Sequence, residues 1–150
     1  MTFDKKQYYT GETAKVSIHT DATMCKKDIK GFKFRLMRRH WAKDTGYYKW
    51  CTTSDRYMET EEAKGMDKGT EKTFEMTLRI PTEDDFKDDS GVPEEHAAML
   101  KSFSSTVEGK IIQVDYYLKV FIQFHAWNDW GEGKSCSLPI DVLQPPIQYV

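Results

Sequence analysis

The chain is poor in cysteine and has no long apolar run, and each shortage excludes a class of protein. Its 150 residues contain three cysteines, Cys25, Cys51 and Cys136, without CxxC spacing. They predict neither a disulfide framework nor a zinc knuckle, and they favour a reducing compartment. No apolar run approaches the roughly 18–20 residues of a membrane span, and the polar first six residues lack the apolar core of a signal peptide. We therefore expect a cytoplasmic protein.

A strong net charge and a catalytic constellation are also lacking. The formal net charge of -2 provides no basic field for tracking nucleic acid, so we expect no nucleic-acid partner. The histidines, His19, His40, His96 and His125, are scattered, with no spacing suited to metal and no nucleophile constellation beside them. The sequence therefore predicts a protein that is not an enzyme and that carries no metal and no cofactor.

Aromatic residues and alternating runs are what the chain does contain. Phe, Trp and Tyr make up 13% of the residues, more than a disordered segment carries. A chain of 150 residues fits a single domain with one core. We expect one domain over residues 1–150, with flanking tails at residues 1–8 and 145–150.

The longest alternation of apolar and polar residues lies between residues 111 and 142. Its apolar positions are Ile112, Val114, Tyr116, Leu118, Val120, Ile122 and Phe124, then Cys136, Leu138, Ile140 and Val142. A period of two is typical of a half-buried β-strand. The turn-rich residues 125–133 separate the two runs, so the sequence predicts a hairpin with a long tip.

Shorter runs of the same period occur earlier in the chain. They centre on Ala14, Val16 and Ile18, on Phe32, Phe34 and Leu36, and on Phe74, Met76, Leu78 and Ile80. Gly31 suggests a bulge or a close backbone approach, and residues 43–46 predict a turn into a further antiparallel strand. Residues 55–70 are polar and ambiguous. Pro93 is suited to open one short helix in residues 93–101, but the chain as a whole predicts an all-β sandwich.

The order of these features resembles the C-terminal domain of the arrestin family. The resemblance rests on the turn at residues 8–12, the strand at residues 74–81, the alternating run at residues 111–120, and Leu138-Pro139-Ile140 followed by Pro145-Pro146. It implies an immunoglobulin-like β-sandwich that serves as a non-catalytic adaptor in trafficking, endocytosis or signalling. The implied partners are membrane-protein cargo, a receptor or ubiquitin-ligase machinery.

The run at residues 111–120 is most similar to the α-arrestins and related adaptors. Two features of the family are not recognisable. The acidic lariat motif that senses phosphate in visual and β-arrestins is missing between residues 86 and 103, so no phosphate switch is carried over. The stretch Pro145-Pro146-Ile147-Gln148-Tyr149 has one residue too many for a Pro-Pro-x-Tyr motif.

The tip of the long hairpin is the first candidate contact site. Trp127, Asn128, Asp129 and Trp130 stand together there. Burying one indole ring contributes several kcal/mol, at roughly 25 cal/mol per Å² of apolar surface removed from water. We hypothesise that Trp127 or Trp130 anchors the protein at a partner or at lipid headgroups, giving peripheral contact with a membrane. The alternative, which we favour, is that both rings pack on neighbouring strands.

The second candidate site is a basic patch of Lys30, Lys33 and Arg35. Lys33 and Arg35 share an outward face if the alternate apolar residues point inward. The resemblance aligns Lys30 with a lysine that binds inositol phosphate in β-arrestins. The alternative function is therefore binding of anionic lipid or inositol phosphate, and a weaker one is a carbohydrate-binding sandwich in which Trp127 and Trp130 stack on sugars.

Overall fold

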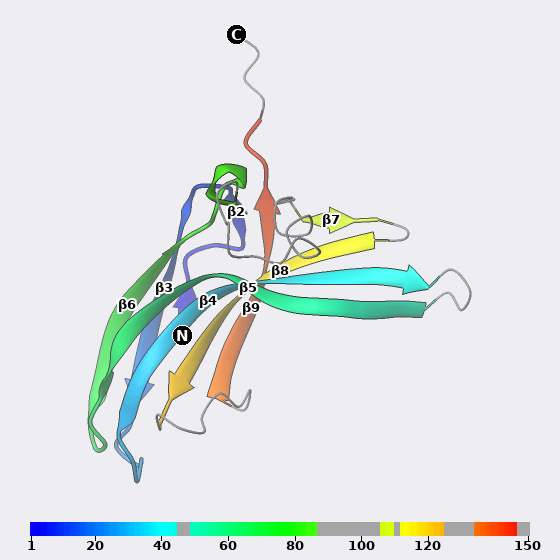
Figure 1. Cartoon of the computed structure of the whole chain (residues 1–150). Coiled ribbons are helices and arrows are strands. Elements are labelled where there is room, and N and C mark those ends of the chain that lie inside the picture. The colour runs from blue at the N-terminus through cyan, green and yellow to red at the C-terminus, as the bar shows by residue number, and fades with distance from the viewer. Residues whose placement is uncertain (45–48, 87–105, 110–111, 125–133, 147–150) are drawn as a thin grey trace.

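The computed structural model describes residues 1–44, 49–86, 106–109, 112–124 and 134–146, and they are almost entirely β-strand (Figure 1). The elements are β1 (Thr2–Phe3), β2 (Gln7–Tyr9), β3 (Thr13–Asp21), β4 (Ile29–Asp44), β5 (Lys49–Met66), β6 (Glu71–Arg79), the 3-10 turn η1 (Glu83–Phe86), β7 (Val107–Glu108), β8 (Ile112–Gln123) and β9 (Ser135–Leu143). The predicted short helix at residues 93–101 lies outside the described residues.

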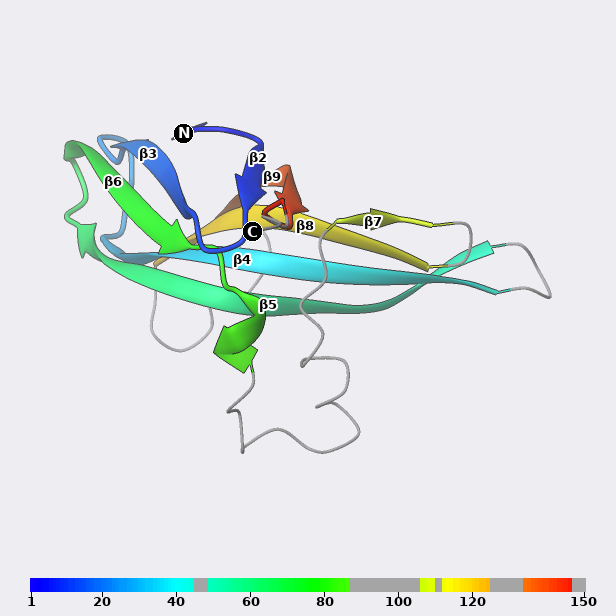
Figure 2. The ribbon, with the colours of Figure 1, turned by 90° about the horizontal axis from the view of Figure 1, so that it is seen from above.

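Two sheets form the sandwich. The smaller sheet has the order β1-β3-β6, and the larger has the order β2-β9-β8-β4-β5, with β7 beside β8. The described pairings are antiparallel except that of β2 with β9, which is parallel. Figure 2 shows β3 and β6 over one half of β4 and β5, while the other half of the long strands extends beyond the smaller sheet. The predicted all-β sandwich is confirmed.

The core lies between the sheets and uses the predicted alternation. On β8, Val114, Tyr116, Leu118 and Val120 are buried, while the residues between them are half-buried on the opposite face. The rings of Phe32 and Phe74 meet edge to face across the two sheets, with centroids 4.7 Å apart. Burying each such side chain contributes about 1.5–3 kcal/mol, which is why the period-two runs determine the packing.

Both predicted hairpins are present. β8 and β9 pair from Tyr116↔Ile140 to Phe121↔Ser135, and β4 and β5 pair along nearly their whole length. The second hairpin is longer than the sequence suggested, because the ambiguous residues 55–70 belong largely to β5, an 18-residue strand. Glu61 and Glu62 are consecutive and both exposed, so this strand lacks the alternation that would have identified it.

The prediction of a flanking tail at residues 1–8 is wrong. Thr2–Phe3 pairs with β3, and Gln7–Tyr9 pairs with β9. Tyr8 is fully buried, and its hydroxyl donates to the Asp4 carboxylate and to the carbonyl of Lys5. A buried ring with a satisfied hydroxyl anchors this segment to the sandwich. At the other end, residues 145 and 146 follow β9 and are exposed, and residues 147–150 lie outside the description.

Glycines mark two close backbone contacts at the end of the β4–β5 hairpin. A Cβ atom on Gly65 would stand 1.8 Å from the carbonyl oxygen of Ile29, and one on Gly31 would stand 3.0 Å from that of Ala63. The close approach predicted at Gly31 is therefore confirmed. Gly69, which has a φ of +77°, lies in the turn between β5 and β6.

Candidate functional site

The tryptophan loop predicted as a contact site lies outside the described residues. Trp127, Asn128, Asp129 and Trp130 all fall between the end of β8 and the start of β9. The base of the loop is described: the ammonium group of Lys134 stands 4.3 Å from the centroid of the Phe124 ring. A cation–π contact of this kind contributes about 0.5–1 kcal/mol at an exposed site and joins the two ends of the loop.

Two of the three residues of the predicted basic patch lie on one face of the larger sheet. Lys33 and Arg35 share the outer face of the larger sheet, because Phe32, Phe34 and Leu36 point into the core. Lys30 is exposed at the start of β4, where the neighbouring Ile29 is buried and the strict alternation of Phe32, Phe34 and Leu36 does not hold. Lys33 lies 2.9 Å from the Glu62 carboxylate on β5, with a side chain only 16% exposed. The structure thus brings two of the three cations together, and it offsets one of them with a carboxylate.

A row of alternating cations and aromatic rings runs along the outer face of the larger sheet. The Phe121 ring is flanked by the Arg35 guanidinium at 5.0 Å and the Lys119 ammonium at 4.8 Å. Further along, the Arg39 guanidinium lies 5.2 Å from the Tyr117 ring. The register of β4 against β8 explains the row, because Arg35 stands opposite Lys119 and Arg39 stands opposite Asp115. The sequence alone does not reveal this row, because it depends on the register between strands that are distant along the chain.

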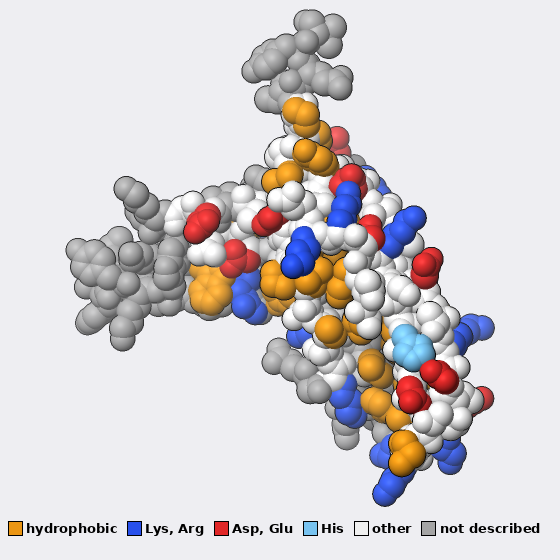
Figure 3. Space-filling model, turned by 180° about the vertical axis from the view of Figure 1, so that it is seen from behind, with side chains coloured by type: hydrophobic (Ala, Val, Ile, Leu, Met, Phe, Trp, Pro, Cys, Tyr) orange, Lys and Arg blue, Asp and Glu red, His pale blue; other side chains and the backbone are white. Residues whose placement is uncertain are grey.

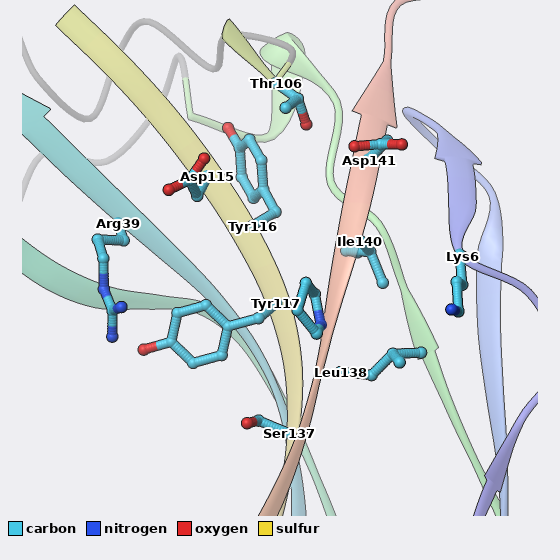
Figure 4. A pocket seen from close by; sticks show the side chains of 11 residues that line it. Lys6, Arg39, Thr106, Asp115, Tyr116, Tyr117, Ser137, Leu138, Ile140 and Asp141 are labelled. Carbon is cyan, nitrogen blue, oxygen red and sulfur yellow. The ribbon is translucent and has the colours of Figure 1, made fainter. Parts of the chain in front are cut away.

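A hollow of about 630 Å³ opens beside β9. Residues 137–141 of β9 and 115–117 of β8 line it, together with Lys6, Arg39 and Thr106. Figure 4 shows Arg39, Asp115 and Tyr117 on one side of β8, and Leu138, Ile140 and Lys6 beyond β9. A wall that combines aliphatic side chains, an aromatic ring and both signs of charge is suited to a peptide chain.

The two acids of the hollow are each held by a glutamine. The Gln113 amide donates to Asp115 at 2.9 Å, and the Gln7 amide donates to Asp141 at 3.2 Å. The second bond ties β2 to β9, where Gln7 and Asp141 are register partners.

Seen from behind, hydrophobic side chains form a broken band through the middle of the molecule, with Lys and Arg side chains along it (Figure 3).

The acids beside the turns are held as carboxylates by hydrogen bonds. Partial burial opposes ionisation of Asp4, but bonds from Tyr8 and from the backbone amide of Lys15 outweigh it and lower its pKa. The backbone amide of Thr82 and the Arg79 guanidinium lower the pKa of Asp85 to about 2. Burial and the neighbouring Asp4 raise the pKa of Tyr8, which keeps its hydroxyl a donor. These groups are structural, because each holds a strand end or a turn.

Arg38 is buried, with 2% of its surface exposed, on the core face of β4. Its position follows from the alternation of Phe32, Phe34 and Leu36, so the parity of the strand could have identified it in the sequence. A buried guanidinium costs folding free energy unless it is hydrogen-bonded, so this position constrains how the core is built.

The described ranges hold no group of three or more His, Cys, Asp or Glu side chains that could bind a metal ion. In the same ranges, no helix is long and apolar enough to span a bilayer.

No curated protein sequence matches this chain. Residues 1–147, however, match the family model of the arrestin (or S-antigen) C-terminal domain. Since this match covers nearly all of a two-sheet β-sandwich, the chain belongs to the arrestin family, in which it represents the C-terminal domain.

Proposed function

We propose that this protein is a non-catalytic adaptor that binds membrane proteins or their regulators in trafficking or signalling. The observation that carries the proposal is the match of residues 1–147 to the arrestin C-terminal domain. Domains of this family generally act as adaptors without catalysis. An adaptor needs a rigid scaffold with accessible edges, faces and loops, and a two-sheet sandwich provides these.

The surface described above supports binding better than it supports chemistry. The hollow beside β9 and the row of cations and rings on the outer face are the kinds of surface that protein interfaces use, since Arg and aromatic residues are enriched there. In finer detail, we propose a cytoplasmic protein whose partners are membrane-protein cargo, a receptor or ubiquitin-ligase machinery. The similarity to α-arrestins and peripheral contact with a membrane, through Trp127 or Trp130, remain predictions.

Affinity capture of the full chain from cells, followed by mass spectrometry, tests the proposal. A Leu118→Asp variant is the control, because a carboxylate in this fully buried position disrupts the core. An adaptor should enrich membrane proteins or ubiquitin-ligase subunits that the variant loses. If the intact chain and the variant capture the same set, and that set consists of chaperones, the adaptor proposal is wrong.

The alternative of anionic-lipid or inositol-phosphate binding has weaker support. Lys33 is already paired with Glu62. Basic side chains near an anionic surface contribute about 1 kcal/mol each, so a patch of three cations with one of them offset attracts weakly. Flotation with vesicles that contain phosphatidylserine distinguishes the two functions, since salt-sensitive binding that depends on Lys33 and Arg35 would favour the lipid function.

A further inference from the structure

One stretch of β9 has a strand on one side only. β8 pairs with β9 from Ser135 to Ile140, while β2 pairs with it on the other side only at residues 141–143. Among the residues that the structure describes, no strand lies beside residues 135–140 on the side of β2. In the described part of the chain the larger sheet therefore has an open edge, which lies beyond the first residue of β2, Gln7, and next to the hollow lined by residues 137–141.

The backbone direction shows which groups face this edge. The amide of Asp141 donates to the carbonyl of Lys6 at 2.9 Å, so odd-numbered residues of β9 turn their peptide groups toward β2. By alternation, Ser137 directs both its N–H and its C=O to the open edge. Pro139 directs a carbonyl there and has no N–H to offer. Proline is tolerated inside a strand where its nitrogen faces such an edge, so Pro139 is independent support for this orientation.

The opposite edge of the same sheet carries charged residues, whereas this edge is interrupted only by the proline at position 139. Where the side chains of β5 are described, it carries the exposed charged residues Glu61, Glu62 and Lys64. Charged side chains on an edge strand discourage the addition of another strand. Residues 135–140 of β9, Ser-Cys-Ser-Leu-Pro-Ile, carry no charge. Apart from the missing amide of Pro139, the sequence of this edge has no feature that opposes pairing.

The charged residues nearest Ser137 in the paired strands are lysines. Lys119 stands directly opposite Ser137 on β8, and Lys134 precedes β9. Residues 116–121 of β8 and 134–140 of β9 contain no acid. Two acids, Asp115 and Asp141, also line the hollow, and each accepts a hydrogen bond from a glutamine side chain. An incoming strand beside Ser137 therefore meets a positive field.

We propose that the edge of β9 at residues 135–139 binds an extended acidic segment of a protein partner by strand addition. The backbone of the segment pairs with Ser137 and with the carbonyl of Pro139. Its alternate side chains divide between the two faces: the acidic ones lie on the face of Lys119, and the apolar ones lie beside the half-buried Leu138. This inference rests on the proposed adaptor function, because it names the surface and the chemistry of the partner.

Fluorescence anisotropy on the full chain tests the inference with a defined probe. The probe is a fluorescein-labelled peptide of alternating Glu and Val, and a matched peptide carries Lys in place of Glu. Ser137→Pro removes the edge amide without removing a bond to β8, and we expect it to weaken binding of the acidic probe about tenfold. Lys119→Glu should weaken it about three- to tenfold at low salt. Lys64→Glu makes the same charge change on the opposite edge and should leave binding unchanged.

A second probe avoids reliance on the folding of the variants. Methylating the peptide nitrogens of the acidic probe at alternate residues removes its backbone donors and leaves its charge intact. Strand addition predicts that the probe methylated on the pairing residues loses binding by at least about tenfold, while one methylated on the intervening residues keeps it. In the ¹⁵N spectrum of the chain, the amide signal of Ser137 should shift as the unmethylated probe is added.

Several results would overturn the inference. The first is equal binding of the lysine peptide. The second is binding that is insensitive both to Ser137→Pro and to methylation. The third is an edge occupied by a second copy of the chain, seen as a dimer that the probe does not dissociate. Binding of phosphatidylserine vesicles with loss of the peptide signal would point to a lipid surface instead. If cellular capture retains its partners while the peptide tests fail, the adaptor function stands and its contact lies elsewhere.

Discussion

At the scale of single residues, backbone geometry and local hydrogen bonds decide where this chain tolerates change. Gly65 allows β5 to pass against the start of β4, and Asp85 organises the turn after β6. Neither position is in the core. Their effects are therefore separable from hydrophobic burial, and each can be tested with one substitution.

Gly65→Ala should strongly destabilise the protein. The new Cβ atom would stand 1.8 Å from the carbonyl oxygen of Ile29, so one of two paired strands must move. We expect a loss of about 3 kcal/mol or more in the free energy of unfolding, measured by urea denaturation. Gly69→Ala is the control, since nothing lies within 4 Å of its Cβ and only its positive φ opposes the change, at about 1 kcal/mol. Equal losses at both positions would contradict the prediction.

Asp85→Asn should reduce stability in a pH-dependent manner. The pKa of Asp85 is lowered from 3.8 to about 2 in the folded chain. The ionised carboxylate therefore stabilises the fold above about pH 4, and this contribution is lost as the pH falls through about 2. Because the group is exposed, we expect a loss of only about 0.5–1 kcal/mol at pH 7.

Urea denaturation of the wild type and of Asp85→Asn between pH 7 and pH 2 measures this effect. The difference between the two proteins should shrink toward zero at the acid end. Glu75→Gln, which changes an exposed carboxylate on β6, should show a much smaller difference at pH 7. A pH-independent difference for Asp85→Asn would mean that its charge is not the stabilising feature.

At the scale of elements, the two faces of β8 have different roles. Leu118 is fully buried between the sheets, whereas Lys119 is half-buried on the outer face and lies over the Phe121 ring. Leu118→Ala should lower the free energy of unfolding by about 2–5 kcal/mol, because it leaves a cavity in the core. Lys119→Ala should lower it by less than about 1 kcal/mol. Comparable losses in thermal and urea denaturation would mean that the alternation does not set the packing.

The strands that the sequence predicted are those with one face in the core. β3, β6, β8 and β9 alternate because each buries every second residue against the other sheet. β5 could not be identified in this way, since it is an edge strand that the smaller sheet covers over only part of its length. β1 and β2 were missed because strands of two or three residues are too short to show a period.

The candidate sites were less predictable than the strands, because they depend on contacts between distant segments. To predict the outer-face row one must know the register that sets Arg35 opposite Lys119. To predict the open edge one must know that β2 pairs with β9 only from Asp141 onward. Neither follows from the pattern of a single strand. The tryptophan loop could be named from the sequence alone, and its role in contact remains a prediction.

At the scale of the whole molecule, the distribution of the core predicts how the chain unfolds. One cluster of buried side chains draws on β2, β3 and β6 as well as on β4, β8 and β9. Neither sheet can keep its apolar face from water without the other, since the smaller sheet has only three strands. The two sheets should therefore unfold together as a single domain.

Native-state hydrogen exchange in low urea tests this cooperativity directly. The amide protons of Val16 in the smaller sheet and Leu118 in the larger sheet should exchange with the same opening free energy, equal to that of global unfolding. Far-UV circular dichroism and tryptophan fluorescence should show coincident urea transitions. Faster opening at Val16 than at Leu118 would show that the smaller sheet separates first. In that case residues 1–150 would not form one cooperative domain, and the open edge of β9 would lie on a sheet that persists without its partner.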